Sequence, residues 1–123
     1  MAAHGKKILI VEDERPLSKA LELKLTKEGY TTSTAVNGND AVELLGKEKF
    51  DLIVLDLVMP QYDGFHVLEY IHENKLPIKA IVLSNLSQGE DMKKAKAFGA
   101  LEYYVKSNTP IVELVENVKQ ALE

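Results

Sequence analysis

Side chains capable of chemistry follow four of the five short apolar runs in this sequence, at the point where each run ends. They are Glu12 and Asp13 after the first run, Asp56 after the third, Ser84 and Asn85 after the fourth, and Lys106 after the fifth. A carboxylate can attack an activated phosphoryl donor and form an acyl phosphate. Mg²⁺ accepts carboxylate oxygens, and a hydroxyl and an ammonium can donate to phosphoryl oxygens. Phosphoryl transfer therefore becomes a hypothesis if the fold brings these groups together.

The apolar runs alternate with amphipathic stretches along the whole chain. The runs predict strands at 7–11, 31–35, 52–56, 78–83 and 101–105, and the apolar spacing predicts helices at 15–28, 40–47, 65–73, 89–98 and 109–122. The third run shows no polar alternation, which indicates a strand covered on both faces. Five strand-then-helix units predict an α/β fold with a doubly wound five-stranded parallel sheet, flavodoxin-like order 2-1-3-4-5, and helices on both faces.

Local signals support several of these boundaries. Pro16 suits the first turn of a helix, and Gly29 suits the residue after its end. The dipeptide Asn37-Gly38 is typical of a turn. Thr109 is expected to be the N-cap of the last helix, with Pro110 at its first position.

This topology gathers the reactive side chains, because ligands of such sheets bind outside the carboxyl ends of the strands. The first and third strands are central neighbours, so Glu12, Asp13 and Asp56 are expected to converge. Like charges resist ionising together, and a divalent cation relieves that conflict. The sequence therefore predicts a Mg²⁺ site beside Asp56, with Ser84 and Lys106 approaching from the other side.

Composition narrows the class of protein further. The 123 residues carry a net charge of −4, which argues against direct nucleic-acid binding by this domain. The absence of cysteine excludes disulfides and thiolate chemistry. No apolar run is long enough for a membrane span and the start lacks a signal peptide, so a cytoplasmic location is expected. Residues 1–5 are interpreted as a flexible tail and residues 6–123 as one domain.

Four groups of residues, in order, resemble the receiver domains of bacterial two-component response regulators. They are Val11-Glu12-Asp13-Glu14 with Pro16, Asp56-Leu57-Val58-Met59-Pro60 with Asp63-Gly64, Ser84, and Tyr103-Tyr104-Val105-Lys106. The resemblance extends from Lys6 to about Leu122. It implies that Asp56 is the phosphoacceptor, Asp13 a direct Mg²⁺ ligand, Glu12 a ligand often acting through water, and the Val58 carbonyl a further ligand.

The resemblance also implies roles on the opposite side of the site. Lys106 would pair with the acid or the phosphoryl oxygens, Ser84 would turn inward to the phosphoryl group, and Tyr103 would be the aromatic switch residue. One departure from the family is Ser107, where receivers usually carry a proline preceded by a cis bond. A cis bond is costly without proline, so the sequence leaves the conformation after Lys106 open.

The family implies partners as well. Phosphoryl donors would be a histidine kinase or a phosphotransfer protein, and the output would be altered binding of an effector through the fourth helix, fifth strand and fifth helix. Relatives dimerise through that face, so homodimerisation on activation is an open option. Lys93, Lys94 and Lys96 are interpreted as a solvated basic face of the fourth helix.

Three other classes of protein compete with this interpretation. A haloacid-dehalogenase-like phosphatase carries an aspartate two residues after its nucleophile, where this chain has Val58, so only slow self-dephosphorylation is expected. Val58 and Leu86 are expected to screen the acyl phosphate from water. A pseudo-receiver, a binding module that is never phosphorylated, draws support only from Ser107. A flavodoxin relative fits poorly, because the loop after the first strand is acidic.

Overall fold

Five parallel strands form one sheet with the order β2-β1-β3-β4-β5, as the sequence predicts. The computed structural model describes residues 5–58, 64–85 and 89–123. The strands are β1 (Lys7–Val11), β2 (Thr31–Ala35), β3 (Leu52–Leu55), β4 (Lys79–Ser84) and β5 (Ala100–Val105). The helices are α1 (Arg15–Lys27), α2 (Gly38–Lys47), α3 (Gly64–Glu73), α4 (Gly89–Ala97) and α5 (Ile111–Leu122), with a 3-10 turn, η1 (Lys106–Asn108), before α5.

Some of the features expected from the sequence fall outside these ranges. They are residues 1–4 of the tail, Met59, Pro60 and Asp63 of the loop after Asp56, and Leu86. Within the described parts of the chain, no helix combines the length and the apolar character needed to cross a bilayer.

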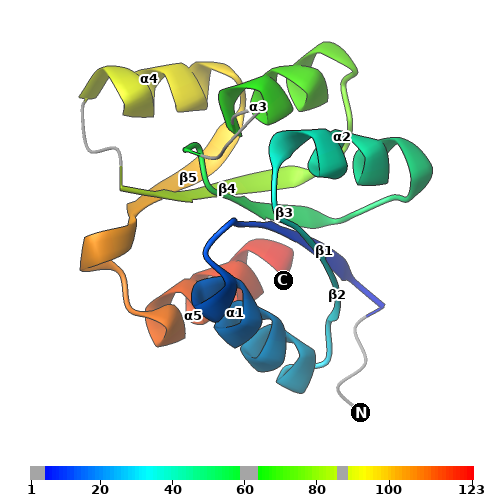
Figure 1. Cartoon of the computed structure of the whole chain (residues 1–123), viewed down its shortest axis with the longest axis vertical. Coiled ribbons are helices and arrows are strands. Elements are labelled where there is room, and N and C mark those ends of the chain that lie inside the picture. Colours follow the sequence, from blue (N-terminus) through cyan, green and yellow to red (C-terminus); the bar gives the residue numbers. More distant parts are fainter. Residues whose placement is uncertain (1–4, 59–63, 86–88) are drawn as a thin grey trace.

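Helices cover both faces of the sheet, with α1 and α5 on one side and α2, α3 and α4 on the other (Figure 1). Alternate residues of each central strand enter different clusters: Leu9 and Val11 pack on the α2–α3–α4 side, whereas Ile8 and Ile10 pack on the α1–α5 side. All four residues of β3 are buried for the same reason. The missing polar alternation is thus explained by a sheet that is covered on both faces.

The ends of α1 and α2 follow from local chemistry. Pro16 lies in the first turn of α1, and the chain leaves the helix through Gly29 at φ 102°, a left-handed conformation that favours glycine. The chain bends at Asn37, and α2 already begins at Gly38, before the start at 40 that the sequence predicts. Asn37 is its N-cap, with Oδ1 accepting a hydrogen bond from the Asp40 amide at 2.8 Å.

The start of α5 also differs from the sequence-based expectation. The helix begins at Ile111, and Pro110 occupies the cap position instead of Thr109. The Thr109 hydroxyl donates to the Val105 carbonyl at 3.0 Å and so bridges the η1 turn. Thr109 is therefore not the N-cap, because its hydroxyl is engaged by the residues before the helix.

Candidate functional site

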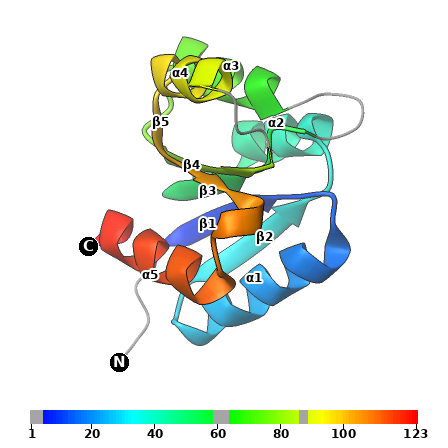
Figure 2. The ribbon, with the colours of Figure 1, turned by 90° about the vertical axis from the view of Figure 1, so that its left-hand side faces the viewer.

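The carboxyl edge of the sheet places the acids side by side. The Asp56 amide donates to the Val11 carbonyl at 3.0 Å, and the Glu12 amide donates to the Ala35 carbonyl at 3.0 Å. Both bonds continue the parallel ladders beyond the last paired residues of the strands, which end with Val11 opposite Leu55. The register of the central strands therefore sets Glu12 beside Asp56. Figure 2 views the molecule from the carboxyl edge of the sheet, with the η1 turn in front.

Three of these carboxylates form one cluster, as expected. Oxygens of Glu12, Asp13 and Asp56 lie within 4.8 Å of one another. Glu12 and Asp56 are buried, and Asp13 is exposed. Carboxylate oxygens at this spacing fit Mg²⁺, which binds hard oxygen ligands and keeps several waters, and the exposed Asp13 leaves room for water. The donor set is therefore compatible with the metal that the sequence predicts.

Asp56 is fixed from two sides by hydrogen bonds. Its Oδ1 accepts from the Val58 amide at 3.0 Å, and its Oδ2 accepts from Lys106 Nζ at 2.9 Å. The Val58 side chain is exposed and lines the pocket beside Asp56. The carboxylate is thus held in one orientation while its surroundings stay open to a reactant.

Lys106 connects the two sides of the site. Its ammonium contacts Glu12 Oε1 at 2.9 Å, Asp56 Oδ2 at 2.9 Å and Glu14 Oε2 at 2.8 Å. The described residues contain no cis peptide bond, so the Lys106–Ser107 bond is trans. The absence of proline after the lysine therefore does not keep the ammonium away from Asp56.

Burial and charge shape the protonation of this cluster. Burial raises the pKa of Glu12 to about 7, although the hydrogen bond from Lys106 opposes that rise. Burial acts to lower the pKa of Lys106, but its hydrogen bonds with Glu14, Glu12 and Asp56 outweigh it and raise the pKa. The lysine is accordingly charged at neutral pH, surrounded by more carboxylates than it can neutralise.

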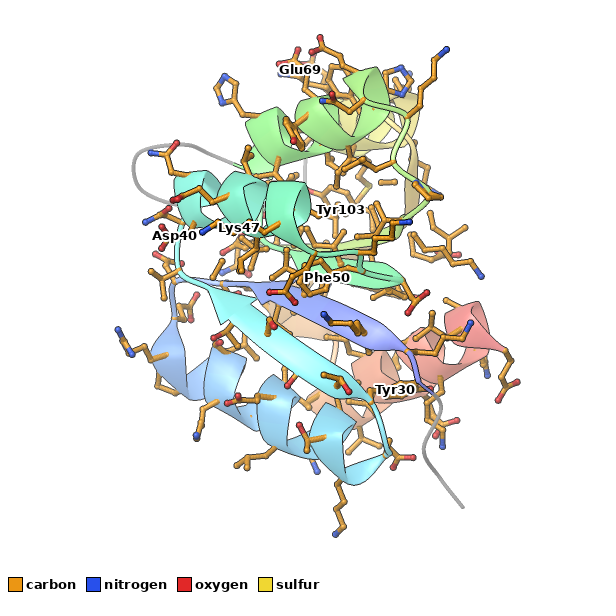
Figure 3. The ribbon with its side chains drawn as sticks, turned by 90° about the vertical axis from the view of Figure 1, so that its right-hand side faces the viewer. Tyr30, Asp40, Lys47, Phe50, Glu69 and Tyr103 are labelled. Atoms are coloured by element: carbon orange, nitrogen blue, oxygen red, sulfur yellow. The ribbon has the colours of Figure 1, made fainter. Side chains whose placement is uncertain are left out.

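Ser84 and Tyr103 meet beside this cluster. Ser84 is fully buried at the end of β4, and Tyr103 lies on the neighbouring strand β5 opposite Val82. Burial raises the pKa of the Tyr103 phenol, and a hydrogen bond with Ser84 opposes the rise. The Tyr103 ring packs against the hydrophobic core on the α2–α3–α4 side of the sheet. Figure 3 shows it between the sheet and these helices. The two residues expected to act as a switch are therefore in contact.

A pocket of about 420 Å³ opens over Asp56. Its lining consists of Asp13, Glu14, Asp56, Val58, Asn85 and Lys106. A small phosphoryl donor or the side chain of a protein donor can therefore reach Asp56 from solvent.

The basic residues of α4 do not line this pocket. Lys93, Lys94 and Lys96 are exposed, as expected, and Lys94 Nζ lies 4.3 Å from the centroid of the Phe65 ring.

Two residues at the site were not singled out by sequence reasoning. Glu14 appeared there only as part of a motif, yet it is a partner of Lys106. Gly64 also appeared only as part of a motif, yet a Cβ at this position would lie 2.3 Å from the Asp56 carbonyl oxygen and 2.5 Å from Leu57 Cα. The Gly64 amide donates to the Leu57 carbonyl at 3.0 Å. Only a glycine lets the start of α3 approach the backbone that carries Asp56 this closely.

Comparisons with known proteins agree with this geometry. The family model described as response regulator receiver domain matches residues 8–119. The probable transcriptional regulator ycf27 of Cyanidium caldarium is 38% identical over 104 residues, which cover 84% of this chain and 41% of that protein. The chain thus spans about two fifths of the length of this curated relative.

Solved structures of receiver domains superpose on almost the whole chain. The response regulator protein TrrA of Thermotoga maritima, in complex with Mg²⁺ and BeF, is 36% identical with a TM-score of 0.81, over 94% of this chain and 97% of that one. The CheY-like receiver domain protein of Methanospirillum hungatei is 26% identical with a TM-score of 0.89, over 95% of this chain and 93% of that one.

Proposed function

Because the chain belongs to the family of response regulator receiver domains, we propose that it is a phosphorylation-dependent signalling switch with Asp56 as its phosphoacceptor. The observation that carries this proposal is the placement of Asp56, which is buried, lines an open pocket, and accepts a hydrogen bond from Lys106 at 2.9 Å. Receiver domains act with kinases and effector domains, and this site has the groups for phosphoryl transfer.

The reaction is a displacement at phosphorus. A carboxylate oxygen of Asp56 forms a bond to the phosphorus atom of phosphohistidine or acetyl phosphate. The phosphorus–nitrogen or phosphorus–oxygen bond of the donor breaks, and the leaving group takes the electron pair. The Lys106 ammonium, already bonded to Asp56, donates to the oxygens on which charge develops.

Mg²⁺ is the proposed cofactor. Glu12, Asp13 and Asp56 would hold it, with the Val58 carbonyl as the further ligand implied by the family. When bound, the ion neutralises charge on the transferred phosphoryl group. The structure of TrrA with Mg²⁺ and BeF supports this assignment by analogy.

The proposed readout is a change in partner binding. Ser84 would bond the phosphoryl group, and its contact with Tyr103 would carry the change toward β5. The proposed partner face is formed by α4, β5 and α5, and two large apolar side chains of these elements, Leu101 and Val112, are exposed. A histidine kinase or phosphotransfer protein as donor, and an effector or a second copy as partner, follow from the family.

The alternatives are a hydrolase and a pseudo-receiver. Val58 stands where an aspartyl-phosphate hydrolase needs its acid, so the phosphorylated form should decay slowly. The pseudo-receiver is disfavoured because Lys106 reaches Asp56 despite Ser107.

Mass spectrometry of the intact protein after incubation with acetyl phosphate and Mg²⁺ tests the proposal. The wild type should gain one phosphoryl group, and chelation of Mg²⁺ or the change Asp56→Asn should abolish the gain. Asp40→Asn, on an exposed position of α2, is a matched control and should react like the wild type. A folded wild type that gains nothing would refute the proposal in favour of the pseudo-receiver.

A further inference from the structure

Glu14 makes a contact that its place in the chain does not require. It is the N-cap residue of α1, but its side chain makes no capping hydrogen bond. Glutamate is also not among the preferred N-cap residues, which are short enough to reach the helix amides. The side chain instead extends across the pocket to Lys106, 92 positions away in the sequence. A poor cap that contacts the site is typical of a residue with a functional role.

The Lys106 ammonium has its three N–H groups matched by three carboxylates. Glu12 and Asp56 are two of them, with side chains only 3% and 4% exposed, whereas the third, Glu14, is 58% exposed. Glu14 is also outside the carboxylate cluster that fits Mg²⁺. Among these partners Glu14 is therefore the one that water can replace most readily, because exposed ion pairs contribute little stability.

A phosphoryl group on Asp56 adds negative charge and acceptor oxygens where Lys106 already contacts the carboxylate. Since Glu14 and Asp56 touch the same nitrogen, the Glu14 carboxylate repels the incoming group as well as competing with it for the ammonium. Resting on the phosphorylation function proposed above, we propose that Glu14 is a positioning residue that holds one N–H of Lys106 in the unphosphorylated protein and releases it to the phosphoryl group.

The affinity for beryllofluoride in the presence of Mg²⁺, measured by calorimetry, tests this release. Glu14→Gln keeps the side-chain length and removes the charge, so it should bind beryllofluoride about two- to fivefold more tightly than the wild type. Glu22→Gln removes the same charge elsewhere on α1, where Glu22 pairs with Lys19 at 3.6 Å, and should match the wild type. Equal or weaker binding by Glu14→Gln would overturn the inference.

A second readout follows the Lys106 ammonium itself by ¹⁵N–¹H NMR. Without ligand, its signal should differ between the wild type and Glu14→Gln. With Mg²⁺ and beryllofluoride the two signals should coincide, because Glu14 no longer contacts the ammonium. A difference that persists in the loaded proteins would overturn the release. If the wild type itself does not bind beryllofluoride, the phosphorylation function fails, which is a separate outcome.

Discussion

The two edges of the sheet both hold a lysine paired with acids, but in opposite surroundings. At the amino edge, Lys7 Nζ lies 2.5 Å from Glu48 Oε1, both side chains are about one-third exposed, and the Lys7 amide donates to Asp51 Oδ2 at 2.8 Å. Figure 3 views this edge, where Phe50 lies beneath α2. At the carboxyl edge, Lys106 is 9% exposed and is shared by Glu12, Glu14 and Asp56.

The two lysines differ in how well their charged partners are neutralised, and this difference distinguishes a structural ion pair from a functional site. At the amino edge, the Lys7–Glu48 pair is screened by water, and Lys7 Nζ also lies 5.2 Å from the centroid of the Phe50 ring. This pair therefore needs no additional cation. At the carboxyl edge a buried surplus of carboxylates is unfavourable unless another cation joins them. A surplus of buried charge, and not an ion pair as such, marks the site.

The largest expected effect comes from removing each lysine in turn. Lys106→Met should lower the free energy of unfolding by about 3–5 kcal/mol, because it leaves buried carboxylates without their cation. Lys7→Met should cost about 0–1 kcal/mol, because its partner can turn to water. Urea unfolding at pH 8 with a chelator present measures both. Similar losses for the two variants would show that burial does not distinguish the edges.

A second expected contrast concerns glycines near the two edges. Gly64→Ala should destabilise by about 3 kcal/mol, since the new Cβ meets the backbone of Asp56 and Leu57, which cannot move aside cheaply. Gly46→Ala, at an exposed position of α2 where the Tyr70 hydroxyl is the one described atom nearby, at 3.8 Å, should stabilise by about 0.5–1 kcal/mol. Thermal unfolding compares the two variants. A Gly64→Ala variant as stable as the wild type would contradict the close approach at Gly64.

Glu12 should make stability depend on pH. Its pKa is raised by burial from 4.5 to about 7, so the folded state binds a proton that the unfolded state has released. Its contribution is therefore full below pH 4.5 and is lost as pH rises through 7, by on the order of 3 kcal/mol. The difference in unfolding free energy between Glu12→Gln and the wild type, measured without metal, should shift in favour of the variant from pH 5 to pH 8. A constant difference would argue against a raised pKa.

The smallest expected effect is at Glu48. Glu48→Gln should lower the unfolding free energy by less than about 1 kcal/mol, because both side chains of the lost ion pair with Lys7 are about one-third exposed. Salt screens exposed pairs, so the difference from the wild type should shrink further in 1 M NaCl, where the Debye length is about 3 Å. Chemical denaturation with urea at low and high salt measures it. A large loss that is insensitive to salt would place this pair with the buried contacts of the other edge.

Much of the architecture could be predicted because its signals are local. The unbroken apolar run at 52–55 and the strict alternation of strands and helices predict the parallel sheet, and the order β2-β1-β3-β4-β5 confirms it. Placing Asp56 near Glu12 needed only the rule that ligands bind at the carboxyl ends of strands. Local signals were less accurate at the starts of α2 and α5, where Asn37 caps its helix through a side-chain hydrogen bond and the Thr109 hydroxyl is bonded to Val105 instead.

The residue types in the chain were enough to predict its family, its sheet, and the set of acids that meet beside Lys106, because strand ends and their polar residues are written in short stretches of sequence. The contact between Glu14 and Lys106 and the approach of Gly64 to the Asp56 backbone could not be predicted in that way. Each depends on the register of several strands and on atomic positions defined to within a few tenths of an ångström. Those quantities exist only once the sheet and its helices have packed together.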